Sequence, residues 1–214
     1  MKQKHILFDL DGTIVRSDLG ITKGVQKSLE HFGIYEELDA LKKFVGPPMV
    51  DSYTNFYGFS LEQYKEALDV FHDYYRSVGI FECELYEGIE EMLKSLSKEY
   101  KLYVATSKPE REAKRVIEHF GLDKYFTFVG GSDGDFNTKR ATKTAVIEYV
   151  LETNKIMHKS FAIMVGDKSH DIVGAGNAGL KSIGVLYGYG GLEEFEGANY
   201  IVKNVEDLRD MFLC

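Results

Sequence analysis

Two carboxylates stand two residues apart in Asp9-Leu10-Asp11-Gly12-Thr13, directly after a short apolar run. In an extended segment, side chains two residues apart leave the backbone on the same face, so both acids would point the same way. The glycine that follows them allows a sharp turn of the backbone. An acidic turn of this kind also occurs as an ordinary solvated loop, so its meaning depends on which other residues join it.

A second pair of carboxylates, Asp167 and Asp171, follows another apolar run that ends at Gly166. Acidic groups that converge from two separate strands repel one another and need a cation. Hard oxygen ligands with room for water molecules suit Mg²⁺. The two acidic segments therefore predict a magnesium site if the fold brings them together.

Two further segments offer hydroxyl and amine groups. Thr106-Ser107-Lys108 follows a third apolar run, and Lys143 opens a helical pattern. Neither signal is specific alone, because Ser and Thr commonly cap the next helix and a surface lysine is usually solvated. Lys139 and Arg140 are rivals of Lys143 for any role in binding a phosphate.

Short apolar runs rich in β-branched and aromatic residues indicate strands, and helical patterns such as Ile89–Leu96 lie between them. This alternation from residue 100 onward favours an α/β fold, a mostly parallel sheet with helices on both faces. Ligands bind beyond the carboxyl ends of such strands, so the chemical residues are expected to meet at one sheet edge. The predicted strands are His5–Phe8, Leu102–Ala105, Tyr125–Val129, Phe161–Val165, Ile183–Leu186 and Tyr200–Val202.

Residues 17–84 separate the first predicted strand from the second and show helical patterns alone. Six apolar residues from Leu61 to Val78 recur at intervals of three and four, which places them along one stripe of a helix. We interpret these side chains as the core of a small helical domain and not as a ligand-binding box. The predicted domains are an α/β core of residues 1–16 and 85–214 and a helical insertion of residues 17–84.

Taken in order, the four chemical segments resemble the motifs of the haloacid dehalogenase superfamily and, within it, of phosphatases similar to phosphoglycolate phosphatase. The resemblance covers nearly the whole chain. It implies a Rossmann-like sheet, and the helical insertion is similar to the family's cap domain. Phe44-Val45-Gly46-Pro47-Pro48 looks like a cap loop that faces the active site in those phosphatases. The motifs are Asp9-Leu10-Asp11-Gly12-Thr13, then Thr106, then Lys143, then Gly166-Asp167 with Asp171.

The resemblance implies Mg²⁺-dependent hydrolysis of a small phosphomonoester. Asp9 would be the nucleophile that forms an aspartyl phosphate, and Asp11 would be general acid to the leaving alcohol and then general base to water. Lys143 would neutralise charge during the transfer. The phosphoryl oxygens would be held by Thr106, Ser107, Lys108 and amides near Gly12, and Mg²⁺ by Asp9, the Asp11 carbonyl and Asp167, with Asp171 close by or bound through water.

Several other functions stay open at this point. A 5'-nucleotidase or a pyrophosphatase of the same family would use the same motifs. In phosphomutases similar to β-phosphoglucomutase, a histidine ten residues after the acid/base aspartate helps to couple cap closure to catalysis, and here that position is Ile21. Phospho-aspartate receiver domains, which signal by binding, are nearer half this length and lack both the insertion and an acid corresponding to Asp11.

Two neighbouring features favour structural roles. We expect His170 to be an exposed loop residue, and Gly188, Gly190 and Gly191 to form a turn at the sheet edge, because their order does not fit a phosphate-binding fingerprint.

Composition limits the partners. The chain has 26 Lys and Arg against 34 Asp and Glu, a net charge of −8, and six against twelve of these fall within residues 17–84. This acidity disfavours binding of a nucleic-acid polymer, while a small phosphorylated metabolite can still bind at a local basic site. No apolar run approaches the roughly 18 residues that span a bilayer. Because the two cysteines form no metal or disulfide pattern, we expect a cytoplasmic protein. We also expect a monomer or a weak dimer.

Overall fold

The computed structural model describes residues 4–47, 49–134 and 139–213. The chain forms two compact units, which we call the core unit (Met1–Val15 with Leu85–Cys214) and the helical unit (Arg16–Glu84). Two short strands, β2 (Val15–Arg16) and β3 (Glu84–Leu85), pair where the chain passes from one unit to the other. The sequence pattern, which predicts helices alone for residues 17–84, misses the part of β3 at Glu84.

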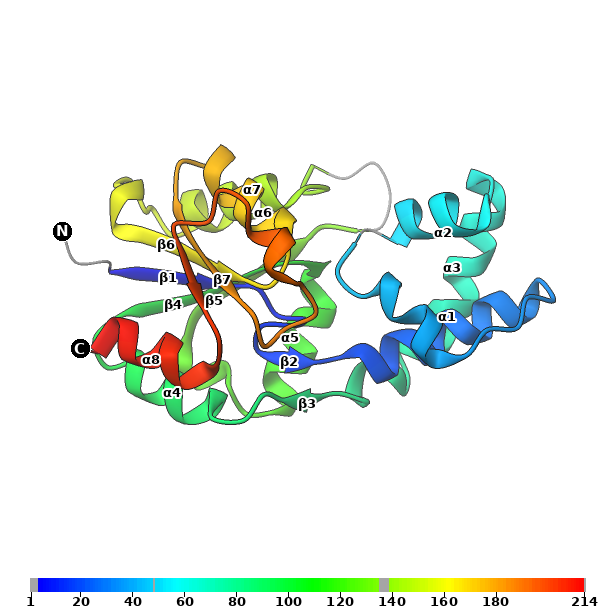
Figure 1. Cartoon of the computed structure of the whole chain (residues 1–214), viewed down its shortest axis with the longest axis horizontal. Coiled ribbons are helices and arrows are strands. Elements are labelled where there is room, and N and C mark those ends of the chain that lie inside the picture. Colours follow the sequence, from blue (N-terminus) through cyan, green and yellow to red (C-terminus); the bar gives the residue numbers. More distant parts are fainter. Residues whose placement is uncertain (1–3, 48, 135–138, 214) are drawn as a thin grey trace. The chain divides into compact units, whose positions relative to one another are not determined.

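A six-stranded sheet forms the centre of the core unit, in the order β5-β4-β1-β6-β7-β8, and every neighbouring pair is parallel (Figure 1). This confirms the predicted α/β class. The central strand β1 pairs with β4 on one side and β6 on the other, so the carboxyl ends of these three strands lie side by side. The strands are β1 (His5–Phe8), β4 (Lys101–Pro109), β5 (Phe126–Ser132), β6 (Ala162–Gly166), β7 (Lys181–Val185) and β8 (Tyr200–Val202).

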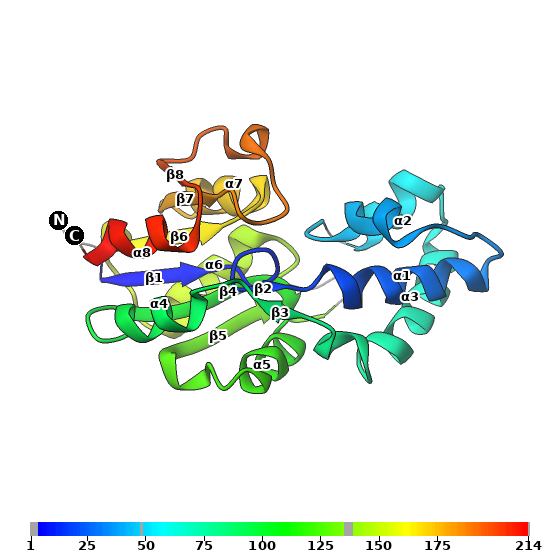
Figure 2. The same ribbon diagram turned by 60° about the horizontal axis from the view of Figure 1, so that its bottom comes forward.

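Helices cover both faces of this sheet (Figures 1 and 2). On one face, α6 and α7 pack against β4–β7, and their apolar side chains enclose a buried cluster that includes Leu7, Tyr103 and Met164. Ile6 and Phe8 alternate with Leu7 along β1 and are equally buried against the other face, as expected for a strand covered on both sides. The core helices are α4 (Ile89–Leu96), α5 (Glu110–His119), α6 (Lys143–Thr153), α7 (Ser169–Asn177) and α8 (Val205–Leu213).

Strand β4 extends further than the sequence predicts. The apolar run ends at Ala105, but the strand continues to Pro109, and its pairing with β5 is irregular between Ala105 and Pro109. Thr106, Ser107 and Lys108 therefore lie within the last part of the strand and not after it. An irregularity of this kind changes the direction of the side chains at a sheet edge.

The helical unit contains α1 (Asp18–His31), α2 (Met49–Tyr57) and α3 (Leu61–Tyr75), and α1 and α3 pack together. Its core is aromatic, with Phe44, Tyr53, Tyr64 and Phe71 all buried. The predicted stripe from Leu61 to Val78 is correct in its middle and wrong at its ends, because Leu61 is 57% and Val78 50% exposed. Leu61 begins α3, and Val78 lies beyond its last residue.

None of the helices in the described part of the chain combines the length and the apolarity that a membrane span requires.

Candidate active site

Three buried carboxylates meet at the carboxyl edge of the sheet. Asp9 follows β1 and Asp167 follows β6, and the pairing of Phe8 with Val165 brings both strands to the same level. Asp171 reaches the same place from the first turn of α7. Carboxylate oxygens of the three residues lie within 4.8 Å of one another. The fold therefore brings together the two acidic segments, as the sequence predicts.

Lys143 supplies positive charge to this cluster. It is the first residue of α6, after the N-cap Thr142, and its side chain is almost fully buried. Its Nζ lies 2.7 Å from Asp9 Oδ1 and 2.8 Å from Asp171 Oδ1, and it also donates to the Ala105 carbonyl at 3.2 Å. Burial alone would lower the pKa of Lys143, but Asp171 and Asp9 more than offset it and raise the pKa. The lysine is thus held charged.

The carboxylates carry more negative charge than this lysine balances. Burial raises the pKa of Asp167 to about 8, with Asp171 and Asp9 adding to the effect. Burial and Asp171 raise the pKa of Asp9 to about 6, although Lys143 acts in the opposite direction. Unit charges about 4 Å apart interact by roughly 4 kcal/mol at an effective dielectric constant near 20. The site therefore favours binding of a proton or a cation.

Asp11 and Lys108 form a second ion pair at the same edge. Lys108 Nζ lies 2.7 Å from Asp11 Oδ2, and the two side chains are 6% and 13% exposed. The pair joins the turn after β1 to the last part of β4, which are 97 residues apart in sequence. Resemblance to the family assigns Lys108 to the phosphate, whereas here its ammonium group contacts Asp11.

Thr106 and Ser107 precede this lysine on β4. Thr106 is buried and its Oγ1 accepts a hydrogen bond from the Lys108 amide at 3.3 Å, while Ser107 is exposed. Gly12 has a φ of 82°, and a Cβ there would lie 2.2 Å from Asp167 Oδ2. The Gly12 amide itself donates to the Val15 carbonyl at 2.8 Å, so a phosphate would have to use other amides of this turn.

Of the three basic residues near α6, only Lys143 contacts the carboxylate cluster among the described residues. Lys139 is exposed. Arg140 donates to Glu110 at 2.9 Å and lies over the Tyr149 ring, 4.0 Å from its centroid. These contacts hold Arg140 beside the first residue of α5 and away from Asp9.

The glycine-rich turn after β7 contributes a contact that the sequence does not reveal. The Tyr189 amide donates to Asp167 Oδ2 at 2.9 Å, and Thr13 Oγ1 lies 3.4 Å from Asp167 Oδ1. Gly188 makes the close approach possible, because a Cβ there would lie 2.3 Å from Asp167 Cβ. The segment is a turn, as predicted, and it also orients Asp167. Its spacing of glycines is the only signal of this role in the sequence.

The prediction that His170 is an exposed loop residue is wrong. This residue lies in the first turn of α7 and is partly buried, so it is not an exposed loop residue. Burial and the nearby Lys143 lower the pKa of its imidazole. Glu194 accepts from the Ser169 amide at 2.9 Å and from Lys168 Nζ at 3.1 Å, and so satisfies an amide at the start of α7.

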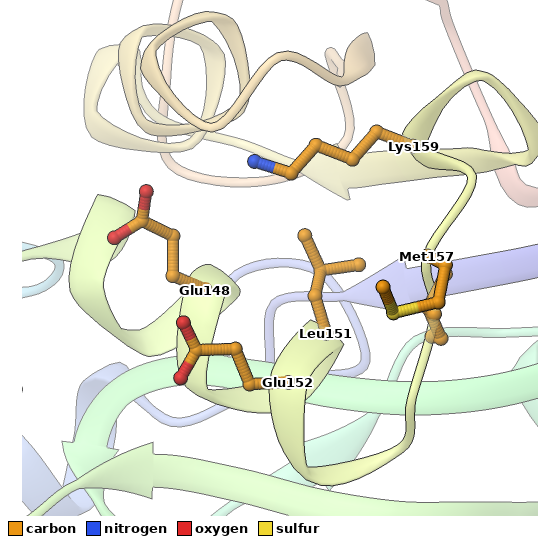
Figure 3. Close-up of a pocket in the computed structure, with 6 residues that line it drawn as sticks. Glu148, Leu151, Glu152, Met157 and Lys159 are labelled. Atoms are coloured by element: carbon orange, nitrogen blue, oxygen red, sulfur yellow. The ribbon is translucent and has the colours of Figure 1, made fainter.

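A separate pocket lies at the opposite edge of the sheet (Figure 3). Glu148 and Glu152 extend into it from α6, and Lys159 comes from the segment that leads into the amino end of β6. Because Asp9 and Asp167 follow the carboxyl ends of their strands, this pocket does not belong to the carboxylate site.

Comparison with known proteins agrees with this geometry. Residues 6–185 match the family model described as haloacid dehalogenase-like hydrolase. A 5'-nucleotidase of Pseudomonas aeruginosa is 36% identical, over 91% of this chain and 87% of its own. Pyrophosphatase PpaX of Halalkalibacterium halodurans is 30% identical, over 99% and 97%. The crystal structure of a predicted phosphatase from Clostridium acetobutylicum is 43% identical with a TM-score of 0.93, over 100% and 99%. The chain therefore belongs to the haloacid dehalogenase-like hydrolases and is a phosphatase of that family.

Proposed function

We propose that this phosphatase hydrolyses small phosphomonoesters with the help of Mg²⁺ and through an aspartyl phosphate formed on Asp9. The observation that carries the proposal is the position of Asp9 at the end of the central strand. Its carboxylate lies 2.7 Å from the buried Lys143 and within 4.8 Å of two further carboxylates. A nucleophile, a fixed positive charge and a set of hard oxygen ligands thus occupy one place.

The donor set suits a divalent cation of the Mg²⁺ type. Asp9, Asp167 and Asp171 offer carboxylate oxygens only, with no sulfur or imidazole among them. The two lysines that pair with Asp9, Asp11 and Asp171 leave two of the four negative charges of the site unbalanced, which one divalent cation would neutralise. We propose that Asp9, Asp167 and the Asp11 carbonyl hold Mg²⁺, with Asp171 beside it. Bound Mg²⁺ would offset the charge of the phosphoryl group.

The phosphoryl oxygens need donors at the edge of β4. We propose Thr106, Ser107 and Lys108 for this role, together with amides of the turn at Gly12. The Lys108 ammonium group has three N–H donors, so it can contact a phosphoryl oxygen and keep its contact with Asp11. The Thr106 hydroxyl accepts a hydrogen bond from the Lys108 amide and can still donate its own hydrogen to a phosphoryl oxygen. Lys143 would stabilise the negative charge that develops between nucleophile and phosphorus.

The reaction would proceed in two displacements. Asp9 attacks phosphorus while Asp11 gives a proton to the leaving alcohol, and Asp11 then takes a proton from the water that hydrolyses the aspartyl phosphate. Asp11 lies beside this centre because it follows Asp9 by two residues, and its ion pair with Lys108 supports a fixed orientation.

Substrate selection would belong to the inserted residues. We propose residues 17–84 as a cap domain and residues 1–16 with 85–214 as the catalytic domain. Phe44 is the last residue of a 3₁₀ helix and Val45 to Pro47 follow it, while Pro48 lies outside the described residues. A nucleoside 5'-monophosphate is the first substrate to test, given the 36% identity to a 5'-nucleotidase, with phosphoglycolate and pyrophosphate as the alternatives.

The proposal is tested by phosphate release from a panel of these esters, together with trapping of the phosphoenzyme by acid quench. Wild type should release phosphate with added Mg²⁺ and lose this activity in EDTA. Asp9→Asn should neither turn over nor trap phosphate, because an amide cannot act as the nucleophile. Asp123→Asn, at an exposed aspartate in a 3₁₀ turn, is the control and should behave as wild type.

Two results would contradict the proposal. Full activity in EDTA would exclude the metal, and equal trapping of phosphate by wild type and Asp9→Asn would exclude Asp9 as the nucleophile.

A further inference from the structure

The pairing of Lys108 with Asp11 places an ammonium group on one particular oxygen of a carboxyl group. Lys108 Nζ contacts Asp11 Oδ2 at 2.7 Å, and both side chains are largely withdrawn from solvent. An ion pair at this distance and burial fixes the rotation of the carboxyl group far better than an exposed pair does.

The other oxygen of the Asp11 carboxyl group, Oδ1, lacks such a contact with any residue that the structure describes. Asp11 Oδ1 is buried and has no hydrogen-bond partner within the described part of the chain. Buried carboxylate oxygens normally accept hydrogen bonds, and leaving one without a partner costs free energy. An oxygen that is buried, unpartnered and held in place by its neighbour is suited to a group that arrives with the substrate.

We propose that Lys108 is a positioning residue that orients the reacting oxygen of Asp11. By occupying Oδ2, Lys108 leaves Oδ1 as the atom that exchanges a proton with the leaving alcohol and with water. This inference rests on the proposed function, because it assigns an atom to the acid and base steps of Asp11.

Both steps balance with this assignment. In the first, Oδ1–H gives its proton to the ester oxygen as the P–O bond to the alcohol breaks and the bond from Asp9 to phosphorus forms. In the second, Oδ1 takes a proton from water as the water oxygen bonds to phosphorus and the bond to Asp9 breaks. Inorganic phosphate leaves, and Oδ1 carries its proton again.

A role in positioning Asp11 predicts a different pattern of loss from a role in binding the phosphate alone. An alkyl ester depends on proton donation because its leaving group is a poor one, whereas a nitrophenyl ester departs readily without it. If Lys108 orients Asp11, its loss should affect ethyl phosphate more than p-nitrophenyl phosphate. If Lys108 only binds the phosphoryl group, both esters should suffer equally, since they share that group.

The experiment compares wild type, Lys108→Met, Lys108→Gln and Lys108→Arg with ethyl, phenyl and p-nitrophenyl phosphate in saturating Mg²⁺. Circular dichroism selects the variants that fold, and Lys108→Gln serves if Lys108→Met does not. Lys101→Met is the matched control, because Lys101 is an exposed residue at the amino end of the same strand. The inhibition constant of inorganic phosphate is measured for each variant.

We expect the loss of kcat/KM in Lys108→Met to be at least about tenfold greater for ethyl phosphate than for p-nitrophenyl phosphate, because misdirecting Asp11 forfeits part of the 10² to 10⁴ that general acid–base catalysis contributes. Phosphoenzyme should accumulate with p-nitrophenyl phosphate, because the water step also needs Asp11. Lys108→Arg should recover part of both effects, and Lys101→Met should match wild type.

An equal loss for all three esters, accompanied by a matching rise in the inhibition constant of phosphate, would overturn the inference and leave Lys108 as a phosphate ligand. So would a Lys108→Arg variant no better than Lys108→Met. The proposed function fails in a different way, with a wild type that releases no phosphate or an Asp11→Asn variant that keeps full activity on ethyl phosphate.

Discussion

Lys143 is the residue on which the charge balance of the site depends. It is buried and contacts both Asp9 and Asp171 from the first turn of α6. Among the described residues, no other lysine lies at hydrogen-bond distance from these two carboxylates. Replacement by alanine should reduce kcat by on the order of 10² or more, because a preorganised positive charge is lost at the reacting group. Steady-state kinetics with a good aryl ester measures this directly.

Arg140 and Lys139 provide the controls for this substitution. Lys139→Ala should leave kcat unchanged, because its side chain is exposed. Arg140→Ala should cost less than Lys143→Ala, since Arg140 contacts Glu110 and Tyr149 instead of the carboxylates. If Arg140→Ala or Lys139→Ala lowered kcat more than Lys143→Ala does, the assignment of Lys143 as the residue that stabilises the transferred charge would be contradicted. Thermal unfolding of each variant separates a loss of catalysis from a loss of folded protein.

The raised pKa values of Asp167 and Asp9, about 8 and about 6, predict how stability depends on pH. Without a metal, the folded chain binds more protons than the unfolded chain between the ordinary aspartate pKa of 3.8 and these raised values. The free energy of unfolding should therefore fall as the pH rises through this window. His170, whose pKa is lowered, acts in the opposite sense below its ordinary value of 6.5.

A divalent cation should reverse the carboxylate effect, because it binds the charged forms. We expect Mg²⁺ to raise Tm more at pH 8 than at pH 5, and Asp167→Asn to lose most of this difference. Thermal unfolding in EDTA and in MgCl₂ across this range measures both effects, and the difference between wild type and Asp167→Asn removes the contribution of His170. A Tm gain that is the same at both pH values would contradict the assignment of the cation to these carboxylates.

At the scale of elements, the turn between β7 and β8 controls the orientation of Asp167. A Cβ at Gly188 would lie 2.3 Å from Asp167 Cβ and 2.4 Å from the Gly12 carbonyl, so either Asp167 or the turn after β1 must move. Gly188→Ala should raise the Mg²⁺ concentration needed for half-maximal activity and lower Tm. Both follow from displacing one carboxylate of the cluster.

Gly176 offers a matched control for this substitution. It lies in α7, and nothing comes within 4 Å of a Cβ built there. Gly176→Ala should leave the Mg²⁺ requirement unchanged and stabilise the helix by up to about 1 kcal/mol. If Gly188→Ala kept the Mg²⁺ requirement of wild type, the turn would have no part in orienting Asp167.

The elements with strong local patterns are predicted well from the sequence. β1 and β8 have the predicted bounds, because each is a short apolar run that ends at polar residues. In α4 the predicted apolar face, from Ile89 to Leu96, is buried. β4 is predicted too short, since Thr106 to Lys108 look like a turn in sequence and are held in the strand by pairing with β5. A pattern of residue types along one segment contains no information about the strand beside it.

The difference between patterns along one segment and contacts between segments also explains which parts of the site can be predicted from the sequence. The acids, Thr106 and Lys143 can be found from the sequence because their chemistry depends on side-chain type and order along the chain. The contact of the Tyr189 amide with Asp167 is made by backbone, so the glycines around Tyr189 are its only signal in the sequence and do not identify its partner. The pair of Lys108 with Asp11 joins residues 97 positions apart, so only the folded structure reveals it.

At the scale of the whole molecule, the proposed aspartyl phosphate would pass its phosphoryl group either to water or to a second substrate. A mutase has to protect its aspartyl phosphate from water until a sugar phosphate accepts the group, so its general base must act only on productive closure. Phosphomutases similar to β-phosphoglucomutase use a histidine at the position of Ile21 to couple cap closure to catalysis. Ile21 lies in α1 of the helical unit with 6% of its surface exposed, and its side chain offers no hydrogen bond.

We therefore predict a hydrolase and not a mutase. Asp11 lies in the core unit beside Asp9, and the control that a histidine would exert is absent at Ile21, so water should hydrolyse the aspartyl phosphate as soon as the alcohol has left. Incubation with β-glucose 1-phosphate and a trace of the 1,6-bisphosphate tests this, with glucose 6-phosphate and inorganic phosphate measured in the same sample. Phosphate release without isomerisation is the expected result. Formation of glucose 6-phosphate faster than phosphate would overturn the prediction, and an Ile21→His variant shows whether a histidine there shifts the ratio of the two products.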